Sequence, residues 1–355
     1  MQDRFEATGN GWDWILAKQQ FETINALRGL AAILVVMFHA ARWFGWMTPR
    51  EAFLCVDLFF MMSGFVIAHS YETRLSSGLK PGQFTLARLI RLYPLYILGF
   101  TLAVVARSLE PFFFMPVPWF AAQVFMLPAP TYHFFYPVLY IYNHPAWSLL
   151  YEILINILYA YTWRLWSIPN IVLVVTGAAI LMLVSPHFHG DGGDSWNTVN
   201  FGLFRIFYAF PAGVLIYRLR GRLSAVTPSV SGLIIVPILP LALIAIPNFT
   251  WQACYFLVFH ILLTFAIVSR TDQVTSHVFN MLGTASYAIY VIHMPLISIT
   301  STLLPLNKTV LNGRLVGFAF IALLIPLSIF VDFIYDGPVR GFLTRRLLPP
   351  RGATP

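Results

Sequence analysis

The sequence predicts an all-α, polytopic integral membrane protein: a bundle of about ten transmembrane helices plus one re-entrant or interfacial outer segment. Of its 355 residues, 58% are hydrophobic and only 10% are charged, whereas soluble domains carry about 25% charged residues. The chain also contains about ten apolar runs of roughly 20 residues, the length that crosses a bilayer. The net charge of +8 matches the excess of Lys and Arg in cytoplasmic loops better than it matches nucleic-acid binding.

The expected spans follow one another through most of the chain. They lie near residues 24–44, 52–71, 92–109, 144–163, 169–186, 200–217, 230–247, 250–269, 283–304 and 314–335. We therefore expect a cytoplasmic lead-in over 1–22, one transmembrane domain over 23–338 and a basic cytoplasmic tail over 339–355.

Residues 111–142 are apolar enough to cross the membrane but contain six prolines. Repeated prolines remove backbone donors and break helices. A full span here would also move the downstream basic loops to the outside, against the positive-inside tendency. We expect a re-entrant or interfacial hairpin on the outer side, with both chain termini in the cytoplasm.

Arg28 and His39 lie in the first apolar run, where ionisable side chains are costly and usually functional. Their spacing of eleven residues is close to three helical turns, so both project from nearly the same face, roughly 16 Å apart along the axis. This pattern predicts an anionic substrate near the surface and proton transfer by His39 deeper inside. A histidine that is merely hydrogen-bonded in the packing is the alternative.

The second run contains Asp57 and the pair Ser63-Gly64. Asp57 could reach His39 and fix its tautomer, as a carboxylate does in hydrolytic triads. Alternatively, it bonds a neighbouring helix or the outer headgroups. Ser63-Gly64 favours close helix packing over a nucleophile.

Arg88 and Arg91 are three residues apart and hence share a helical face at the cytoplasmic surface. Such a pair can grip phosphate or pyrophosphate. Binding of lipid headgroups, together with a role in topology, explains it equally well.

Glu152 lies one or two turns inside a span, where a carboxylate needs a partner or a proton. It is a candidate for acid–base chemistry or for bonding an acceptor hydroxyl, with a helix-bridging role as the alternative.

Asn143 and His144 precede Glu152 at the outer mouth, where they can touch substrate. Tyr290 and His293 share a face of a later span and either line the same cavity or bond between helices.

Five segments, in chain order, resemble the membrane-bound acyltransferase family 3, bacterial enzymes that O-acylate extracytoplasmic polysaccharides and related molecules. The family's Arg–ten residues–His signature matches Arg28 and His39, and its acidic, Phe-rich Ser-Gly-Phe span matches Asp57 to Phe65. The remaining matches are Arg88, Arg91, Tyr93 and Pro94; Trp147, Ser148, Leu149 and Glu152; and Ser286, Tyr287, Tyr290 and His293. Asp336-Gly337-Pro338 stands where the family has Glu-x-Pro.

The resemblance implies an O-acyltransferase of the bacterial inner membrane. It implies an acyl-CoA co-substrate, with acetyl-CoA as the default, bound by Arg28, Arg88 and Arg91. His39, with Asp57 or Glu152, would act as general base or as transient acyl carrier. Asn143, His144, Trp147, Ser148, Tyr290 and His293 would contact substrate. The implied partners are membrane lipid and an extracytoplasmic sugar or lipid-linked glycan, with a homodimer possible and no nucleic acid or metal.

Two other functions compete with this one. A proton-coupled transporter or permease would use the same intramembrane residues without covalent chemistry, although the sequence lacks inverted repeats. Release of coenzyme A would distinguish the enzyme from the transporter. An intramembrane serine hydrolase ranks last, because no Gly-x-Ser-x-Gly elbow is present.

A weak metal-binding pattern is formed by His187, His189 and Asp191, but an exposed loop explains these residues better.

Overall fold

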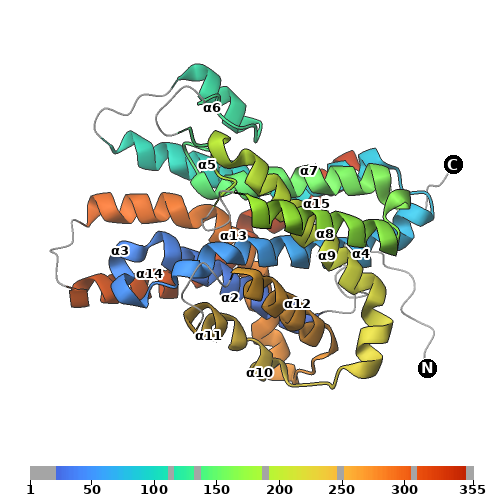
Figure 1. Ribbon diagram of the computed structural model, residues 1–355. Coiled ribbons are helices and arrows are strands. Elements are labelled where there is room, and N and C mark those ends of the chain that lie inside the picture. Colours follow the sequence, from blue (N-terminus) through green and yellow to red (C-terminus); the bar gives the residue numbers. More distant parts are fainter. Residues whose placement is uncertain are drawn as a thin grey trace, which may run out of the picture.

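The computed structural model describes residues 21–110, 116–131, 137–185, 192–245, 252–304 and 310–348. Within these ranges the protein is a polytopic helical membrane bundle without named β-strands. Six helical segments are long and apolar enough to cross a bilayer: Glu22–His39, Arg50–Ser76, Pro81–Ser108, Trp196–Val226, Gln273–Leu303 and Gly313–Leu347. Figure 1 shows the long helices running side by side.

The helices that build the site are α2 (Glu22–His39), α4 (Cys55–Ser76), α5 (Pro81–Ser108), α7 (Trp147–Thr162), α9 (Val199–Val226) and α13 (Gln273–Leu303). The others are α3 (Ala41–Phe44), α6 (Val117–Val124), α8 (Ile168–Val184), α10 (Gly232–Ile235), α11 (Ile238–Ala245), α12 (Gln252–Val268), α14 (Val310–Val331) and α15 (Gly337–Leu347). A π-helical turn over Asp332–Asp336 joins α14 to α15.

Small residues let the central helices approach closely. A Cβ atom on Gly64 of α4 would overlap the carbonyl oxygen of Phe210 in α9, and one on Gly283 of α13 would overlap Asn25 of α2. The α2–α13 contact is also polar, since the Asn25 amide donates to the Asn280 side chain at 2.8 Å. The expectation that Ser63-Gly64 serves close packing is therefore met at Gly64.

Each of the ten expected spans coincides with helix. Among the described residues, however, only six helical segments are both long and apolar enough to cross a bilayer. The expected span at 230–247 consists of two short helices, α10 and α11, with Pro237 between them, because proline cannot continue a helical hydrogen-bond ladder. The third span begins earlier than expected. Helix α5 starts at Pro81 with Pro at its first turn, so Arg88 and Arg91 lie inside a helix.

The proline-rich segment 111–142 contains only the eight-residue helix α6 among its described residues. Eight helical residues extend about 12 Å, far short of the roughly 30 Å of a bilayer core. Tyrosine hydroxyls bond the turn after α6: Tyr93 donates to the carbonyl of Val124 at 2.8 Å, and Tyr140 to that of Met126 at 2.6 Å. The expected non-crossing segment therefore packs against α5 through side chains that satisfy its free carbonyls.

Two loops join at the end of the bundle where α2 ends. Val138 and Ser195 form an antiparallel bridge. The Leu139 amide donates to the carbonyl of Asp194, and the Trp196 amide to that of Pro137, both at 2.8 Å. These loops carry His144 and Asp194, so the bridge fixes both residues above the cavity described next.

Candidate functional site

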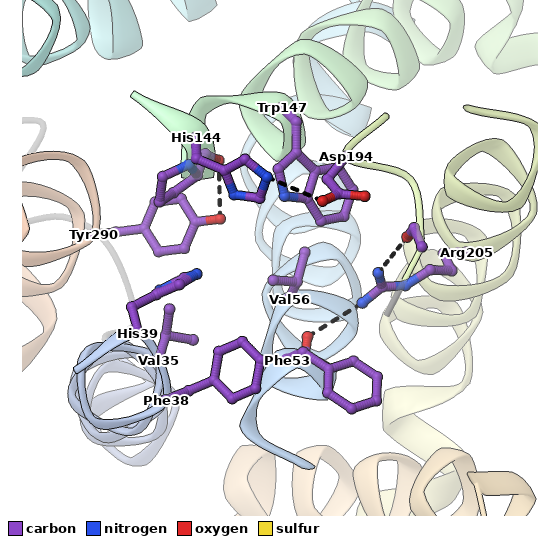
Figure 2. Close-up of a pocket in the computed structure, with 12 residues that line it drawn as sticks. Val35, Phe38, His39, Phe53, Val56, His144, Trp147, Asp194, Arg205 and Tyr290 are labelled. Carbon is purple, nitrogen blue, oxygen red and sulfur yellow. Dashed lines mark hydrogen bonds and ion pairs between the residues drawn. The ribbon is translucent and has the colours of Figure 1, made fainter. Parts of the chain in front are cut away.

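A small cavity opens where α2 ends. Its lining comes from α2, α4, α7, α9 and α13 and from the segments directly before α4, α7 and α9 (Figure 2). The lining residues are Val35, Phe38, His39, Phe53, Val56, His144, Pro145, Trp147, Gly192, Asp194, Arg205 and Tyr290. Mostly apolar walls with two imidazoles and one carboxylate are typical of a site for a small reacting group.

The tautomer of His39 follows from a chain of hydrogen bonds. Nδ1 of His293 lies 3.1 Å from the carbonyl oxygen of Ile289 and 2.8 Å from that of Tyr290. Carbonyl oxygens only accept, so this nitrogen carries a proton. In neutral His293, Nε2 then holds a lone pair and accepts from Nδ1 of His39 at 3.0 Å. The remaining nitrogen of His39, Nε2, is left with a free lone pair.

His293 was expected to contact substrate, but it stands behind His39 and is fully buried. It is absent from the cavity lining. Its position reflects the helix: the bonded carbonyls are three and four residues earlier in α13, on the face that packs against α2. His293 therefore orients His39 and does not itself face the cavity.

Asn143 is also placed differently from expectation. It is buried, and its amide donates to the carbonyl of Val291 at 2.8 Å. Pro295 lies four residues after Val291 inside α13 and has no N–H to bond that carbonyl. Asn143 replaces the missing helical bond, so it ties the loop before α7 to α13, and it is not among the residues that line the cavity.

Ser148 and Tyr290 form one buried pair, with their hydroxyls 2.7 Å apart and each 3.1 Å from the carbonyl of Pro145. Tyr290 lines the cavity, whereas Ser148 does not. Trp147, also expected at the substrate, lines the cavity and covers the guanidinium of Arg205 at 5.3 Å. Of the expected substrate-contact residues, the cavity is thus lined by His144, Trp147 and Tyr290.

Asp57 does not reach His39. Both its carboxylate oxygens accept from Arg205 of α9, at 2.9 Å and 2.8 Å, and both side chains are buried. Arg205 also donates to the carbonyls of Gly192 and Phe53 at 2.7 Å and 3.2 Å. A buried carboxylate pairs with the nearest fixed cation, and here that cation comes from α9. Asp57 therefore anchors α4 to α9 and to the loop above the cavity.

Glu152 likewise has partners other than His39. One of its oxygens accepts from Arg88 and from Ser63, both at 3.0 Å. This arrangement bridges α4, α5 and α7, the helix-bridging alternative that the sequence left open. The same place holds several charged side chains, because Arg28 lies within electrostatic range of Arg88, Arg91 and Glu152.

Arg28, Arg88 and Arg91, the three residues expected to hold a donor, thus form one cluster on α2 and α5. Arg88 is held by Glu152, and Arg91 lies 3.5 Å from Asp336. For Arg28, the described part of the chain provides neither a hydrogen bond nor an ion pair, although its side chain is half-buried. A half-buried guanidinium without a partner is costly, so this position favours an anionic ligand.

Asp336 and Arg340 complete the cluster; the sequence pointed to Asp336 only as a departure from the family's Glu-x-Pro and did not point to Arg340 as a site residue. Asp336 is fully buried and also accepts from Arg340 at 2.8 Å, while Arg340 bonds Asp332 at 3.0 Å. Arg340 lies at the start of the expected basic tail, in α15, which packs against α5. Together with Glu152, the cluster holds four arginines against three carboxylates, so one positive charge is in excess.

His144 and Asp194 face His39 across the cavity (Figure 2). Nε2 of His144 lies 3.0 Å from a carboxylate oxygen of Asp194. Burial alone would raise the pKa of Asp194, but the hydrogen bond and charge of His144 outweigh it and hold this pKa below the ordinary value of 3.8. Asp194 was not identified from the sequence, where it appeared only as one of several loop residues.

The metal pattern at His187, His189 and Asp191 falls outside the described residues. In the ranges that the structure covers, no three His, Cys, Asp or Glu side chains gather as a metal site would require.

Comparison with known proteins identifies the family to which the chain belongs. Residues 21–333 match the family described as "Acyltransferase domain", acyltransferase family 3. "Protein 2 in picA locus" of Rhizobium radiobacter is 33% identical over 185 residues, which cover 47% of this chain and 95% of that protein. "Putative membrane-bound transacylase BcsY" of Komagataeibacter xylinus is 38% identical over 77 residues, 22% of this chain and 18% of that protein. No solved structure matches the sequence significantly.

The family match covers the cavity residues and the arginines of α2 and α5, while Asp336 and Arg340 lie just beyond its end. A helical membrane bundle, a cavity with a free imidazole nitrogen and this match agree with one another. The chain belongs to the membrane-bound acyltransferase family 3 and is an O-acyltransferase.

Proposed function

We propose that this enzyme moves an acyl group, with acetyl as the first candidate, from acyl-CoA to a hydroxyl of an extracytoplasmic carbohydrate or glycolipid. The observation that carries the proposal is the free Nε2 lone pair of His39, which remains at the cavity because Nδ1 of His39 donates to His293. An imidazole fixed in this tautomer can accept the hydroxyl proton or the acyl group.

The donor site lies at the arginine cluster. Arg28 supplies an unpartnered guanidinium, and the cluster has one positive charge in excess. Coenzyme A carries phosphates, which guanidinium groups bind by paired, charge-assisted hydrogen bonds. We assign this end to the cytoplasmic face of a bacterial inner membrane, in agreement with the basic loops, and place both chain termini on that face.

Arg28 and His39 lie on one helix, about 16 Å apart along its axis. The phosphates of the donor would therefore bind near one end of α2, while the arm that carries the thioester extends toward the other. The cavity at His39 receives the acceptor hydroxyl from the opposite side. This arrangement explains why a single span carries both an arginine and a histidine.

The first test measures release of free coenzyme A from acetyl-, propionyl- and succinyl-CoA by the purified protein in nanodiscs, with methyl glycosides as acceptors. Acylated product is identified by mass spectrometry. Wild type is compared with His39→Ala, Arg28→Ala and the exposed control His277→Gln, each shown to be folded by its melting curve. We expect release by wild type and the control, loss in His39→Ala, and recovery of Arg28→Ala at saturating donor. Undiminished release by folded His39→Ala would end the case for His39.

A further inference from the structure

The cavity contains a second reactive imidazole, on the wall opposite His39. His144 lies in a short 3-10 turn, His144–Ala146, directly before α7. Its Nε2 is 3.0 Å from Asp194. An ionised carboxylate only accepts, so this nitrogen carries the proton, and neutral His144 presents the lone pair of Nδ1. His144 and His39 are close enough to interact electrostatically.

Asp194 belongs to a loop, yet its position is fixed by bonds on several sides. Its carbonyl accepts from the Leu139 amide at 2.8 Å. Its neighbour Gly193 donates to the hydroxyl of Thr198 at 2.9 Å, and Arg205 holds the carbonyl of Gly192 at 2.7 Å. The carboxylate is therefore held against His144 by the surrounding fold, as a positioned catalytic pair requires.

The two imidazoles have different surroundings. His144 is a third exposed on its side chain and is paired with a carboxylate, which stabilises an imidazolium. His39 is bonded to the neutral, fully buried His293 and to the backbone of Val35, and among the described residues no carboxylate pairs with it. A positive charge on His39 would lack a counter-ion in an apolar interior, which is unfavourable. His144 is therefore the better proton acceptor, and His39 is better suited to react as a neutral nucleophile.

We propose that the two histidines divide the reaction: His39 carries the acyl group, and the His144–Asp194 pair takes the proton from the acceptor hydroxyl. This inference rests on the function proposed above. It assigns to His144 a catalytic role at the hydroxyl, beyond simple contact with substrate.

In the first step, Nε2 of His39 bonds to the thioester carbonyl carbon. The C–S bond breaks, and the coenzyme A thiolate leaves with its electron pair and takes a proton from water at the donor end. The Nδ1 proton of His39 is then shared with Nε2 of His293, so the positive charge of the acyl-imidazolium is spread over both rings and lasts only until the second step.

In the second step, the acceptor hydroxyl gives its proton to Nδ1 of His144 as its oxygen bonds to the acyl carbon. The bond from that carbon to His39 breaks, the electron pair returns to Nε2, and Nδ1 recovers its proton from His293. The imidazolium of His144, balanced by Asp194, then releases a proton to water at the cavity mouth. The sum is acyl-CoA plus alcohol giving ester plus coenzyme A.

The test separates the two steps. Without an acceptor, incorporation of tritiated coenzyme A into acetyl-CoA reports formation and reversal of the acyl-enzyme. With ethanol or trifluoroethanol, ester formation reports the second step. Both are measured in nanodiscs on the full chain for wild type, His39→Ala, His144→Gln, Asp194→Asn and the control His277→Gln. Binding of acetyl-CoA confirms that each variant is folded.

We expect His144→Gln to keep the exchange and to lose ester formation from ethanol by about 100-fold, the usual contribution of a general base. Asp194→Asn should follow the same pattern to a smaller extent. The loss should be smaller for trifluoroethanol, because a more acidic alcohol needs less help from a base. His39→Ala should lose both activities.

Three results would overturn the division of labour. They are wild-type levels of ester formation in His144→Gln, loss of the exchange in folded His144→Gln, and a wild type that forms ester without exchange. Exchange by wild type with no transfer to either alcohol would equally refute the cavity as a hydroxyl site. A wild type that binds acetyl-CoA but shows neither activity would instead refute the proposed function itself.

Discussion

Nδ1 of His39 and Nε2 of His293 lie 3.0 Å apart, and the other nitrogen of His293 is bonded to two backbone carbonyls. Carbonyl oxygens cannot donate a hydrogen bond, so the donor and the acceptor of each hydrogen bond in this series are determined. The backbone of α13 thereby determines which nitrogen of His39 faces the cavity. A side chain on one helix is thus set in its reactive form by the main chain of another.

The first prediction concerns this orientation. His293→Phe keeps a ring of similar shape but removes the acceptor for His39, so the two tautomers of His39 become closer in population. We expect kcat to fall about 10- to 100-fold, as for other orienting partners, with the donor KM nearly unchanged. Nitrogen chemical shifts of labelled His39 would show the redistribution of the proton. An unaltered tautomer in the variant would contradict the orienting role.

The second prediction concerns the donor. Arg28→Ala removes the guanidinium that has no partner among the described residues and should weaken acyl-CoA binding. Loss of one charge-assisted hydrogen bond amounts to about 1.5–3 kcal/mol, or roughly 10- to 100-fold in KM at similar kcat. Arg222→Ala removes an exposed arginine of α9 and serves as the matched control. A fall in kcat at unchanged KM would place Arg28 in the chemical step instead.

The third prediction concerns the buried pair of Asp57 and Arg205. Asp57→Leu removes the carboxylate that pairs with the buried Arg205 cation, and we expect a loss of about 3–5 kcal/mol in stability. The double variant Asp57→Leu with Arg205→Met should recover much of that loss. Thermal unfolding in detergent measures both. A stable single variant without activity would instead indicate that Asp57 takes part directly in the reaction.

The fourth prediction is the pH dependence of the loop above the cavity. The pKa of Asp194 in the folded protein lies below its ordinary value of 3.8, since the bond and charge of His144 outweigh burial. Its ionised form therefore stabilises the fold above that value, and the stabilisation is lost as the pH falls through the folded-state pKa. The melting temperature of wild type should exceed that of Asp194→Asn near neutral pH, and the gap should close in acid. A gap that persists at the lowest pH would contradict this.

Much of the architecture was predictable because bilayer thickness constrains the length of apolar runs. The clustering of Arg28 with Arg88 and Arg91 followed from their positions near the ends of two expected spans, and the structure places the three together. The shortness of the helix in the described part of 111–142 followed from the chemistry of proline. These features depend on local composition, which a sequence displays directly.

The partners of the buried carboxylates were not predictable in the same way. Asp57 and Arg205 are far apart in the chain, and which cation reaches a carboxylate depends on helix packing that no local pattern encodes. One signal was nevertheless available, since Arg205 lies within an expected span and an intramembrane arginine requires a partner. Asp194 gave no such signal, because a loop aspartate is ordinary until its neighbours are known.

Pro295 has a consequence for sequence variation. It leaves the carbonyl of Val291 without a helical donor, and Asn143 supplies the replacement from a loop 148 residues earlier in the chain. Replacement of Asn143 by a residue without a side-chain donor leaves that buried carbonyl without a hydrogen bond. Replacement of Pro295 supplies a backbone N–H as a second donor, so the bond from Asn143 is no longer required. The two positions are therefore expected to co-vary among related sequences, although neither side chain lines the cavity.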